Sequence, residues 1–210
     1  MIRIVIAHQT DLVLIGAQAV LGQSARWSVV AAVSSLPLLL SATDEHQPDI
    51  TIVDGELDPD TDILKLVEIV KETVPHTRLI VVGSLRDGLL VQDLFECGVS
   101  AYLYESDELQ ECMERAIETV MRGRPYLSPT ASSEYLVAMQ TPQRDWRLDA
   151  EARTVLRMLA QGQHVGLIAY ELKIHPRRVY WIREKLRNRL GAQTNEHLMS
   201  RAAAEGYVLP

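Results

Sequence analysis

Residues 148–190 read LDAEARTVLRMLAQGQHVGLIAYELKIHPRRVYWIREKLRNRL, and this stretch decides the fold of the last third of the chain. Its apolar residues recur at the three- and four-residue spacing of helices that pack on one another. Two turn signals divide it, because Gly162 can take a positive φ that ends a helix and Pro176 suits a first helical turn. The spacing therefore predicts three packed helices, followed by a fourth.

The helix that begins near Pro176 combines an apolar stripe with a basic outer face. Its buried stripe is expected to be Val179, Ile182, Leu186 and Leu190. In a helix-turn-helix, the early residues of such a helix meet base edges in the major groove and the later ones are better placed for phosphates. We expect base contacts from Tyr180, Trp181 and Arg183 and phosphate contacts from Arg187 and Arg189. The complete set of expected DNA-binding side chains is Arg177, Arg178, Tyr180, Trp181, Arg183, Lys185, Arg187 and Arg189.

A run of arginines on an amphipathic helix is usually a solvated face, so the distribution of charge along the chain matters. Residues 1–140 carry 9 Lys and Arg against 21 Asp and Glu, whereas residues 141–210 carry 12 against 7. The chain is acidic overall only because its first part is acidic. A basic module on an acidic chain is the asymmetry expected when one domain meets DNA and the other does not.

The order Leu-x-x-x-x-Arg-x-Val-Leu-x-x-Leu-Ala-x-Gly from Leu148 is followed by Ile-Ala-x-x-Leu-x-Ile, Arg-x-Val and Lys-Leu-x-x-x-Leu-Gly, ending at Gly191. This order resembles the four-helix DNA-binding domain of NarL/LuxR-type response regulators. The chain departs from the family at Ala152, where a Glu is usual, at 164–166, where polar residues are usual, and at 178–180, where Thr-Val-Lys is usual. The resemblance therefore implies the docking mode and no particular DNA sequence.

The first part of the chain alternates short apolar runs with amphipathic segments. The expected strands are Ile2–Ala7, Val29–Val33, Ile50–Val53, Leu79–Val82 and Ala101–Tyr104, and the expected helices are Leu12–Leu21, Leu36–Thr43, Ile63–Thr73, Gly88–Cys97 and Asp107–Arg122. This alternation predicts an α/β fold with a doubly wound, five-stranded parallel sheet covered on both faces. In such sheets the functional crevice lies beyond the carboxyl ends of the strands.

Those strand ends carry His8 and Gln9, Asp54, Gly83 and Ser84, and Glu105. Here the chain resembles the flavodoxin-like receiver domain of the same regulator family, with further matches at Leu12-Val13, Gly16, Pro48-Asp49, Gly98–Tyr102 and Gly123–Pro129. The two resemblances together cover nearly the whole chain. They imply a receiver domain over residues 1–123, a linker over 124–145 with a short helix at Glu134–Met139, and an all-α helix-turn-helix domain over 146–210.

A working receiver of this family phosphorylates one Asp, using Mg²⁺ on an acidic pair, a Ser or Thr, and a Lys. The resemblance places Asp54 at the acceptor position, but His8 and Gln9 replace the acidic pair and Glu105 replaces the lysine. Gly83 replaces the hydroxyl residue, unless Ser84 takes that place through a one-residue shift. Mg²⁺ prefers oxygen ligands, and phosphoryl transfer needs cations around the moving group. We therefore expect a degenerate receiver that does not use the ordinary phosphorylation switch.

The degenerate pocket has two interpretations. One is a static network in which a protonated His8 is paired with Asp54, and the other is a site for a small-molecule effector. The static network is favoured, because nothing in the spacing selects a ligand. One His with scattered carboxylates does not indicate a metal site, and no cofactor is expected. The pocket residues are His8, Gln9, Asp54, Glu56, Gly83, Ser84, Tyr102 and Glu105.

Length and composition agree with this organisation. A chain of 210 residues with 47% hydrophobic content can bury a core in each of two domains. It has no run of about 18 apolar residues and no leader-like N-terminus, so we expect a soluble, cytoplasmic protein without a membrane partner. Cys97 and Cys112 are expected to be free thiols, with a redox-sensing pair as the rarer alternative.

Two apolar stripes suit a homodimer, one with Leu14, Leu109 and Met113 and the other with Leu198, Met199 and Ala202. For each of these residues taken singly, a place in the intramolecular core is the better expectation. A dimer is nonetheless expected, because helix-turn-helix proteins commonly read paired half-sites on double-stranded DNA.

The sequence therefore predicts a sequence-specific DNA-binding transcriptional regulator without enzymatic activity. It would act as a homodimer, independently of ordinary Asp phosphorylation and open to control by an effector. One alternative is a response regulator that a sensor kinase still phosphorylates on Asp54. The other is a module that binds a partner protein and no longer reads DNA.

Overall fold

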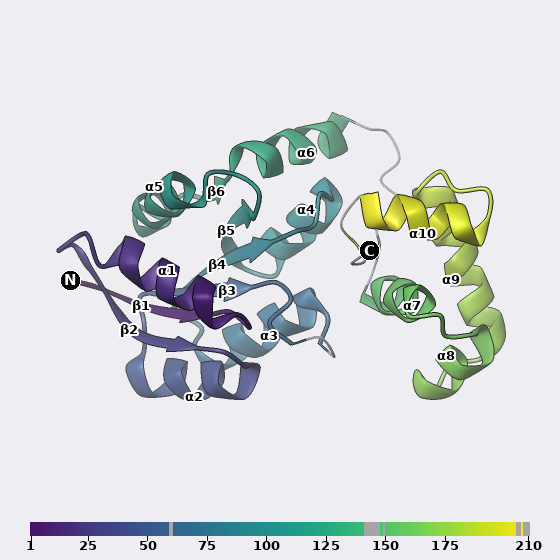
Figure 1. Ribbon diagram of the computed structural model, residues 1–210, viewed down its shortest axis with the longest axis horizontal. Coiled ribbons are helices and arrows are strands. Elements are labelled where there is room, and N and C mark those ends of the chain that lie inside the picture. The colour runs from purple at the N-terminus through teal and green to yellow at the C-terminus, as the bar shows by residue number, and fades with distance from the viewer. Residues whose placement is uncertain (59–60, 141–147, 149, 205–206, 208–210) are drawn as a thin grey trace.

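The computed structural model describes residues 1–58, 61–140, 148, 150–204 and 207, which form an α/β part and a helical part (Figure 1). The α/β part is built on one sheet with the strand order β2-β1-β3-β4-β5-β6, in which every pairing is parallel. The strands are β1 (Ile2–Ala7), β2 (Trp27–Val33), β3 (Ile50–Asp54), β4 (Arg78–Gly83), β5 (Val99–Tyr104) and β6 (Tyr126–Leu127). The expected doubly wound parallel sheet is confirmed, with a sixth strand at one edge.

Helices cover both faces of this sheet. Helices α1 (Asp11–Leu21) and α5 (Leu109–Met121) pack on one face, against a layer that includes Ile4, Ile52 and Ile80. Helices α2 (Leu36–His46), α3 (Ile63–Thr73) and α4 (Gly88–Glu96) pack on the other face. The inner strands read as continuous apolar runs because a sheet with helices on both faces buries consecutive side chains.

The sixth strand and the helix after it, α6 (Pro129–Gln140), extend the α/β part beyond the expected elements. Tyr126 and Leu127 pair with β5 and α6 packs on α4, so close that a Cβ on Gly88 would collide with the backbone of Glu134. The short helix expected at residues 134–139 is thus longer and begins earlier. A two-residue strand between prolines has no periodicity by which the sequence could reveal it. The segment 141–145 of the expected linker lies outside the described residues.

The helical part contains α7 (Ala150–Ala160), α8 (Val165–Glu171), α9 (Pro176–Arg189) and α10 (Asn195–Ala204). Its core includes the stripe expected on α9, since Val179, Ile182, Leu186 and Leu190 are all buried. Gly162 has the expected positive φ, 79°, and Pro176 is the first residue of α9. The sequence thus predicted the arrangement of these helices from their spacing and turn residues.

Four residues of the two stripes considered for dimerisation lie in the core, as expected for each of them taken singly. Leu14 and Met113 are each only 7% exposed, and Leu198 and Ala202 are fully buried. Leu14 and Met113 pack between their helices and the sheet, and Leu198 and Ala202 pack in the core of the helical part. These side chains are therefore buried within the chain itself. The large apolar side chains that α1 exposes are Leu12, Val13 and Ile15.

Within the described ranges, no helix combines the length and the apolar content that crossing a bilayer requires.

Candidate functional site

Helix α9 presents an exposed face of aromatic and basic side chains. The aromatic members are Tyr180 and Trp181, which are 52% and 54% exposed. The guanidinium of Arg178 lies 4.8 Å from the Trp181 ring centre, and that of Arg183 lies 4.9 Å from the Tyr180 ring centre. Lys185 Nζ lies 5.6 Å from the Trp181 ring on the next turn. The stacked cations hold the rings at the surface of the helix, which is unusual for large apolar groups.

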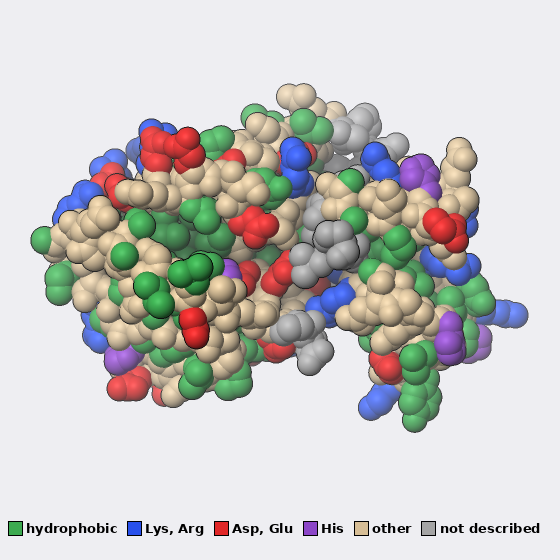
Figure 2. Space-filling model, in the orientation of Figure 1, with side chains coloured by type: hydrophobic (Ala, Val, Ile, Leu, Met, Phe, Trp, Pro, Cys, Tyr) green, Lys and Arg blue, Asp and Glu red, His purple; other side chains and the backbone are tan. Residues whose placement is uncertain are grey.

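Neighbouring elements position this face. Arg178 donates from Nε and Nη2 to Glu151 Oε2 at 2.9 and 2.7 Å, which ties the start of α9 to α7. His175 caps α9 through Nδ1, which accepts from the Arg177 backbone N–H at 3.1 Å. Arg177 is itself exposed. The outer end of the helical part carries basic and hydrophobic side chains side by side in Figure 2.

The two arginines expected to meet phosphates are engaged within the chain. Arg187 donates to the backbone carbonyl of Gln193 and lies 3.4 Å from Glu184. Arg189, the last residue of α9, forms an ion pair with Asp87 of the α/β part. Of the expected DNA-binding side chains, the structure brings six together on this face and draws Arg187 and Arg189 away from it; the six are Arg177, Arg178, Tyr180, Trp181, Arg183 and Lys185.

The crevice at the carboxyl ends of the strands contains the residues expected there. His8 Nε2 lies 3.5 Å from Asp54 Oδ2. The Thr10 backbone N–H donates to His8 Nδ1 at 2.9 Å, so the proton of a neutral His8 ring lies on Nε2 and faces Asp54. Asp54 Oδ1 accepts from the Glu56 backbone N–H at 3.0 Å. The Asp54 carboxylate is therefore held by a local turn and a neutral imidazole, which corrects the expectation of a protonated His8.

Two further side chains of the crevice meet at Glu56. Ser84 Oγ donates to Glu56 Oε1 at 3.0 Å, and Gln9 donates from Nε2 to the Glu56 backbone carbonyl. The Ser84 hydroxyl is therefore inside the crevice but hydrogen-bonded to a carboxylate. Gln9 and Ser84 lock the loop after β3 against the loops after β1 and β4.

Glu105 lies at the mouth of the crevice. Burial first, and then the charges of Glu56 and Asp54, raise the pKa of its carboxyl, and only His8 opposes them. Among the described residues no hydrogen-bond donor contacts its carboxylate. Glu105 therefore adds a further carboxyl group to the crevice beside Glu56 and Asp54.

Gly83 and Tyr102 form a matched pair behind the crevice. Tyr102 is fully buried and donates its hydroxyl to the Leu85 carbonyl at 3.0 Å. A Cβ on Gly83 would lie 2.8 Å from the Tyr102 Oη. Burial raises the pKa of Tyr102, so the phenol stays protonated. The absence of a side chain at position 83 makes the room in which this ring sits.

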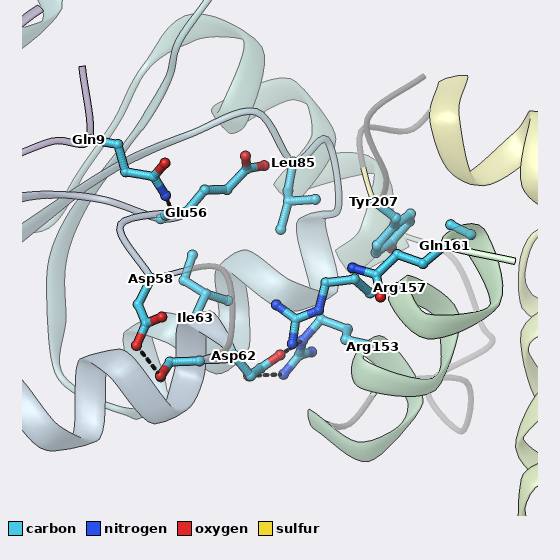
Figure 3. Close-up of a pocket in the computed structure, with 13 residues that line it drawn as sticks. Gln9, Glu56, Asp58, Asp62, Ile63, Leu85, Arg153, Arg157, Gln161 and Tyr207 are labelled. Carbon is cyan, nitrogen blue, oxygen red and sulfur yellow. Dashed lines mark hydrogen bonds and ion pairs between the residues drawn. The ribbon is translucent and has the colours of Figure 1, made fainter. Parts of the chain in front are cut away.

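Sequence reasoning missed the contacts between the α/β and helical parts (Figure 3). Arg153 of α7 pairs with Asp62, which caps α3, through Nε at 2.8 Å and Nη2 at 3.1 Å, and both side chains are at most 10% exposed. Asp87, which caps α4, accepts from Arg189 and from the Tyr207 hydroxyl. Between these contacts lies a cavity of about 370 Å³, which Gln9 and Glu56 line from one side and Arg153 and Gln161 from the other.

These partners are 91, 102 and 120 residues apart in the chain, so no local pattern pairs them. The sequence pointed to one of these residues, because Arg153 is the Arg of the motif that begins at Leu148.

The described residues hold no cluster of three or more His, Cys, Asp or Glu arranged to bind a metal ion. Both cysteines are free thiols whose pKa burial raises, so reactive thiolate is scarce at either position.

Comparisons with known proteins agree with this architecture, although no protein-family model matches the chain. It is 27% identical over 202 residues to the transcriptional regulatory protein UhpA of Salmonella typhimurium, covering 96% of this chain and 97% of that protein. It is 23% identical over 194 residues to the probable transcriptional regulatory protein NarL of Mycobacterium tuberculosis, covering 90% and 88%. The transcriptional regulatory protein LnrK of Bacillus subtilis is 20% identical over 174 residues, covering 83% and 75%.

Solved structures show the same fold. RcsB from Salmonella enterica serovar Typhimurium, bound to a promoter, matches with a TM-score of 0.67 and 18% identity over 97% of this chain and 98% of that one. A LuxR-family two-component response regulator from Aurantimonas matches with a TM-score of 0.62 and 20% identity, covering 67% of this chain and 99% of that one. The chain therefore has the fold of a LuxR-type response regulator, and its sequence is similar along most of its length to NarL-type transcriptional regulators.

Proposed function

We propose that this protein is a cytoplasmic, sequence-specific DNA-binding transcriptional regulator that acts as a homodimer and does not need phosphorylation of Asp54. The observation that carries the proposal is the exposed face of α9, with two solvent-facing aromatic rings and the cations stacked on them. Such a face offers positive charge for phosphates and donors for base edges. The relatives named above as transcriptional regulators, and RcsB bound to promoter DNA, support the DNA-binding part of this proposal.

Within this proposal the side chains divide by position on α9. Tyr180, Trp181 and Arg183 would read bases, and Arg177, Arg178 and Lys185 would hold the flanking phosphates. Arg187 and Arg189 have partners in their own chain, so their contribution to DNA binding would depend on release of those partners.

The crevice supports independence from phosphorylation. Mg²⁺ would meet Gln9 and an imidazole where the related receivers present carboxylates, and its affinity would fall with the lost charge. A phosphoryl group on Asp54 would face Glu105, whose carboxyl already lies close enough to Glu56 and Asp54 for their charges to raise its pKa. The His8 imidazole lies beside Asp54, where it occupies space that a phosphoryl group on Asp54 would need.

The first experiment is selection of genomic DNA fragments by the full-length, untreated protein in EDTA, so that neither Mg²⁺ nor a phosphoryl group contributes. We expect recovery of a shared motif with two half-sites. Recovery of no motif would contradict DNA binding without phosphorylation and would favour a module that binds a partner protein.

Variants of α9 then assign the roles. Arg183→Ala should reduce discrimination between the selected motif and unrelated DNA, whereas Arg177→Ala should weaken binding to both alike and lower the salt dependence by about one phosphate contact. Arg124→Ala, which removes an exposed arginine from the α/β part, is the control. Equal behaviour of the two arginine variants would contradict this docking mode.

A response regulator still phosphorylated on Asp54 is the rival function. It requires a gain in DNA affinity when the protein is treated with acetyl phosphate and Mg²⁺, and loss of that gain in Asp54→Ala. We expect no gain in either protein.

A further inference from the structure

A cavity of about 320 Å³ lies beneath α1 and α5 and opens into the crevice, with which it shares His8, Asp54 and Glu105. Val13 and Ala17 of α1 and Leu109 and Met113 of α5 form its walls, and Ile52 of β3 lies in its floor. Its polar end is made by His8, Asp54 and Glu105. We call this space the α1–α5 cavity. It is distinct from the cavity between the α/β and helical parts, which shares none of these residues.

The strand order explains why the space exists. Helix α1 packs on β1 and β2, and α5 packs on β4, β5 and β6, so neither of them packs chiefly on β3 between those strands. On α1 the two side chains that face this gap are Val13 and Ala17, one turn apart, and a methyl group at position 17 cannot fill it. The cavity therefore follows from the positions of two helices and from one small residue.

The size of the cavity suits a small organic molecule. Ligand sites usually measure about 300–1,000 Å³, and an apolar cavity of about 150 Å³ already holds benzene. The α1–α5 cavity thus has room for a ring or a branched chain with a short extension that reaches the polar end. Burial of that apolar body against the apolar walls would displace water and would favour binding.

The charge at the polar end selects the sign of the ligand. Asp54 and Glu105 line it, Glu56 lies close enough to raise the pKa of Glu105, and His8 is the one basic side chain among the described residues that line the cavity. An anion placed there would meet carboxylates, whereas a cation would neutralise them. Because the Asp54 side chain is only 15% exposed, its neutralisation would count for more than at an open surface.

We propose that the α1–α5 cavity binds a small organic amine with an apolar body, its ammonium group beside Asp54 and Glu105 and its body between Val13, Ala17 and Leu109. This inference rests on the proposed function, in which the α/β part works without a phosphoryl switch. It names the chemical class of the effector that would act on that part. Figure 2 shows hydrophobic side chains gathered over the α1 region, and Val13 belongs both to the cavity wall and to the exposed group with Leu12 and Ile15. An occupant would thus contact a side chain of the surface considered for dimerisation.

The test uses the full-length protein without DNA, so its outcome does not depend on whether α9 reads DNA. Binding of 2-phenylethylamine is measured by titration calorimetry, with 2-phenylethanol and 3-phenylpropionate as neutral and anionic probes of similar shape. We expect saturable one-site binding of the amine, weaker binding of the alcohol by roughly tenfold, and no binding of the acid. No amine binding up to millimolar concentration, or equal binding of amine and acid, would overturn the proposal.

Two pairs of variants locate the site. Ala17→Leu fills the cavity and should weaken amine binding by roughly tenfold or more, whereas Ala19→Leu, the same change on the exposed side of α1, should not. Glu105→Gln should weaken binding of the amine but leave the alcohol unchanged, whereas Glu108→Gln should affect neither. Circular dichroism confirms that each variant is folded. An Ala17→Leu protein that is folded and binds the amine as tightly as the wild type would place the site elsewhere and refute the inference.

Discussion

Arg189 Nη2 lies 3.2 Å from Asp87 Oδ1, which joins the last residue of α9 to the first turn of α4. Asp87 is buried, caps α4 through the Leu89 backbone N–H and also accepts from Tyr207. One carboxylate therefore joins α4, α9 and Tyr207 beyond α10, and a basic side chain of the candidate DNA-binding helix is paired inside the protein.

Asp87→Asn should release Arg189 for DNA. Asn keeps the cap on α4, because its side-chain oxygen also accepts a backbone N–H, but it removes the charge that holds the guanidinium. We expect tighter binding to unrelated DNA and a salt dependence steeper by about one phosphate contact. Fluorescence anisotropy at several salt concentrations measures both. Asp44→Asn on α2 removes the same charge far from α9, and the prediction fails if it gives the same steepening.

Asp62→Asn should loosen the association of the α/β and helical parts. It leaves Arg153, only 7% exposed, facing an amide in place of a carboxylate, at a cost of about 1–3 kcal/mol. Because α7 can move away from α3, we expect a larger radius of gyration in small-angle X-ray scattering. Glu68→Gln breaks the exposed pair with Lys65 on the same helix and should change nothing. Equal scattering from both variants and the wild type would contradict the contact.

Gly83 and Tyr102 should be energetically coupled. Gly83→Ala is expected to cost about 1–3 kcal/mol by pushing on the Tyr102 ring, and Tyr102→Phe about 1 kcal/mol through the lost bond to Leu85. The double variant should be more stable than the sum of these costs predicts, by about 1 kcal/mol, in urea unfolding. Gly16→Ala is the control, since its Cβ would meet nothing within 4 Å and should stabilise α1. Additive costs would show that the two positions do not interact.

Glu105→Gln should stabilise the protein at neutral pH. The pKa of Glu105 is raised above 4.5 by burial and by Glu56 and Asp54, so the folded state binds the proton more tightly than the unfolded state does. That contribution is complete below the unfolded-state pKa and is lost as pH rises through the folded-state pKa. The variant should therefore unfold at higher urea than the wild type at about pH 7, with the difference shrinking towards about pH 4. A variant less stable than the wild type at neutral pH would contradict this sign.

The spacing of apolar residues along the chain predicted the helices of the helical part and the parallel sheet of the α/β part. The spacing of Val179, Ile182 and Leu186 requires a buried helical stripe, and the apolar runs of β1 and β3 require a sheet covered on both faces. The positions of Leu14 and Met113 could not be read this way, because an apolar residue on a helix faces a sheet or a solvent surface with the same periodicity. Only packing on Ile4 and Ile52 decides between them.

Part of the candidate site was likewise predictable from local patterns, and part was not. The residues at strand ends, from His8 to Glu105, were predictable because parallel strands bring their carboxyl ends to one edge. The role of Arg189 was not, since its partner lies 102 residues away and its place at the end of a basic helix suggests phosphate contacts equally well. The α1–α5 cavity beside Ala17 was not predictable either. Its size depends on the position of α5, and the spacing of residues along the chain does not specify that position.

The two-residue strand β6 has a practical consequence for dissecting this protein. It pairs with β5 at the outer edge of the sheet, while α6 covers α4. A fragment that stops after residue 123 would lose both, leaving the backbone groups of β5 without their neighbour and apolar surface of α4 in water. Unpaired edges of this kind template association between chains. Isolated preparations of the α/β part should therefore extend through residue 140 to stay monodisperse.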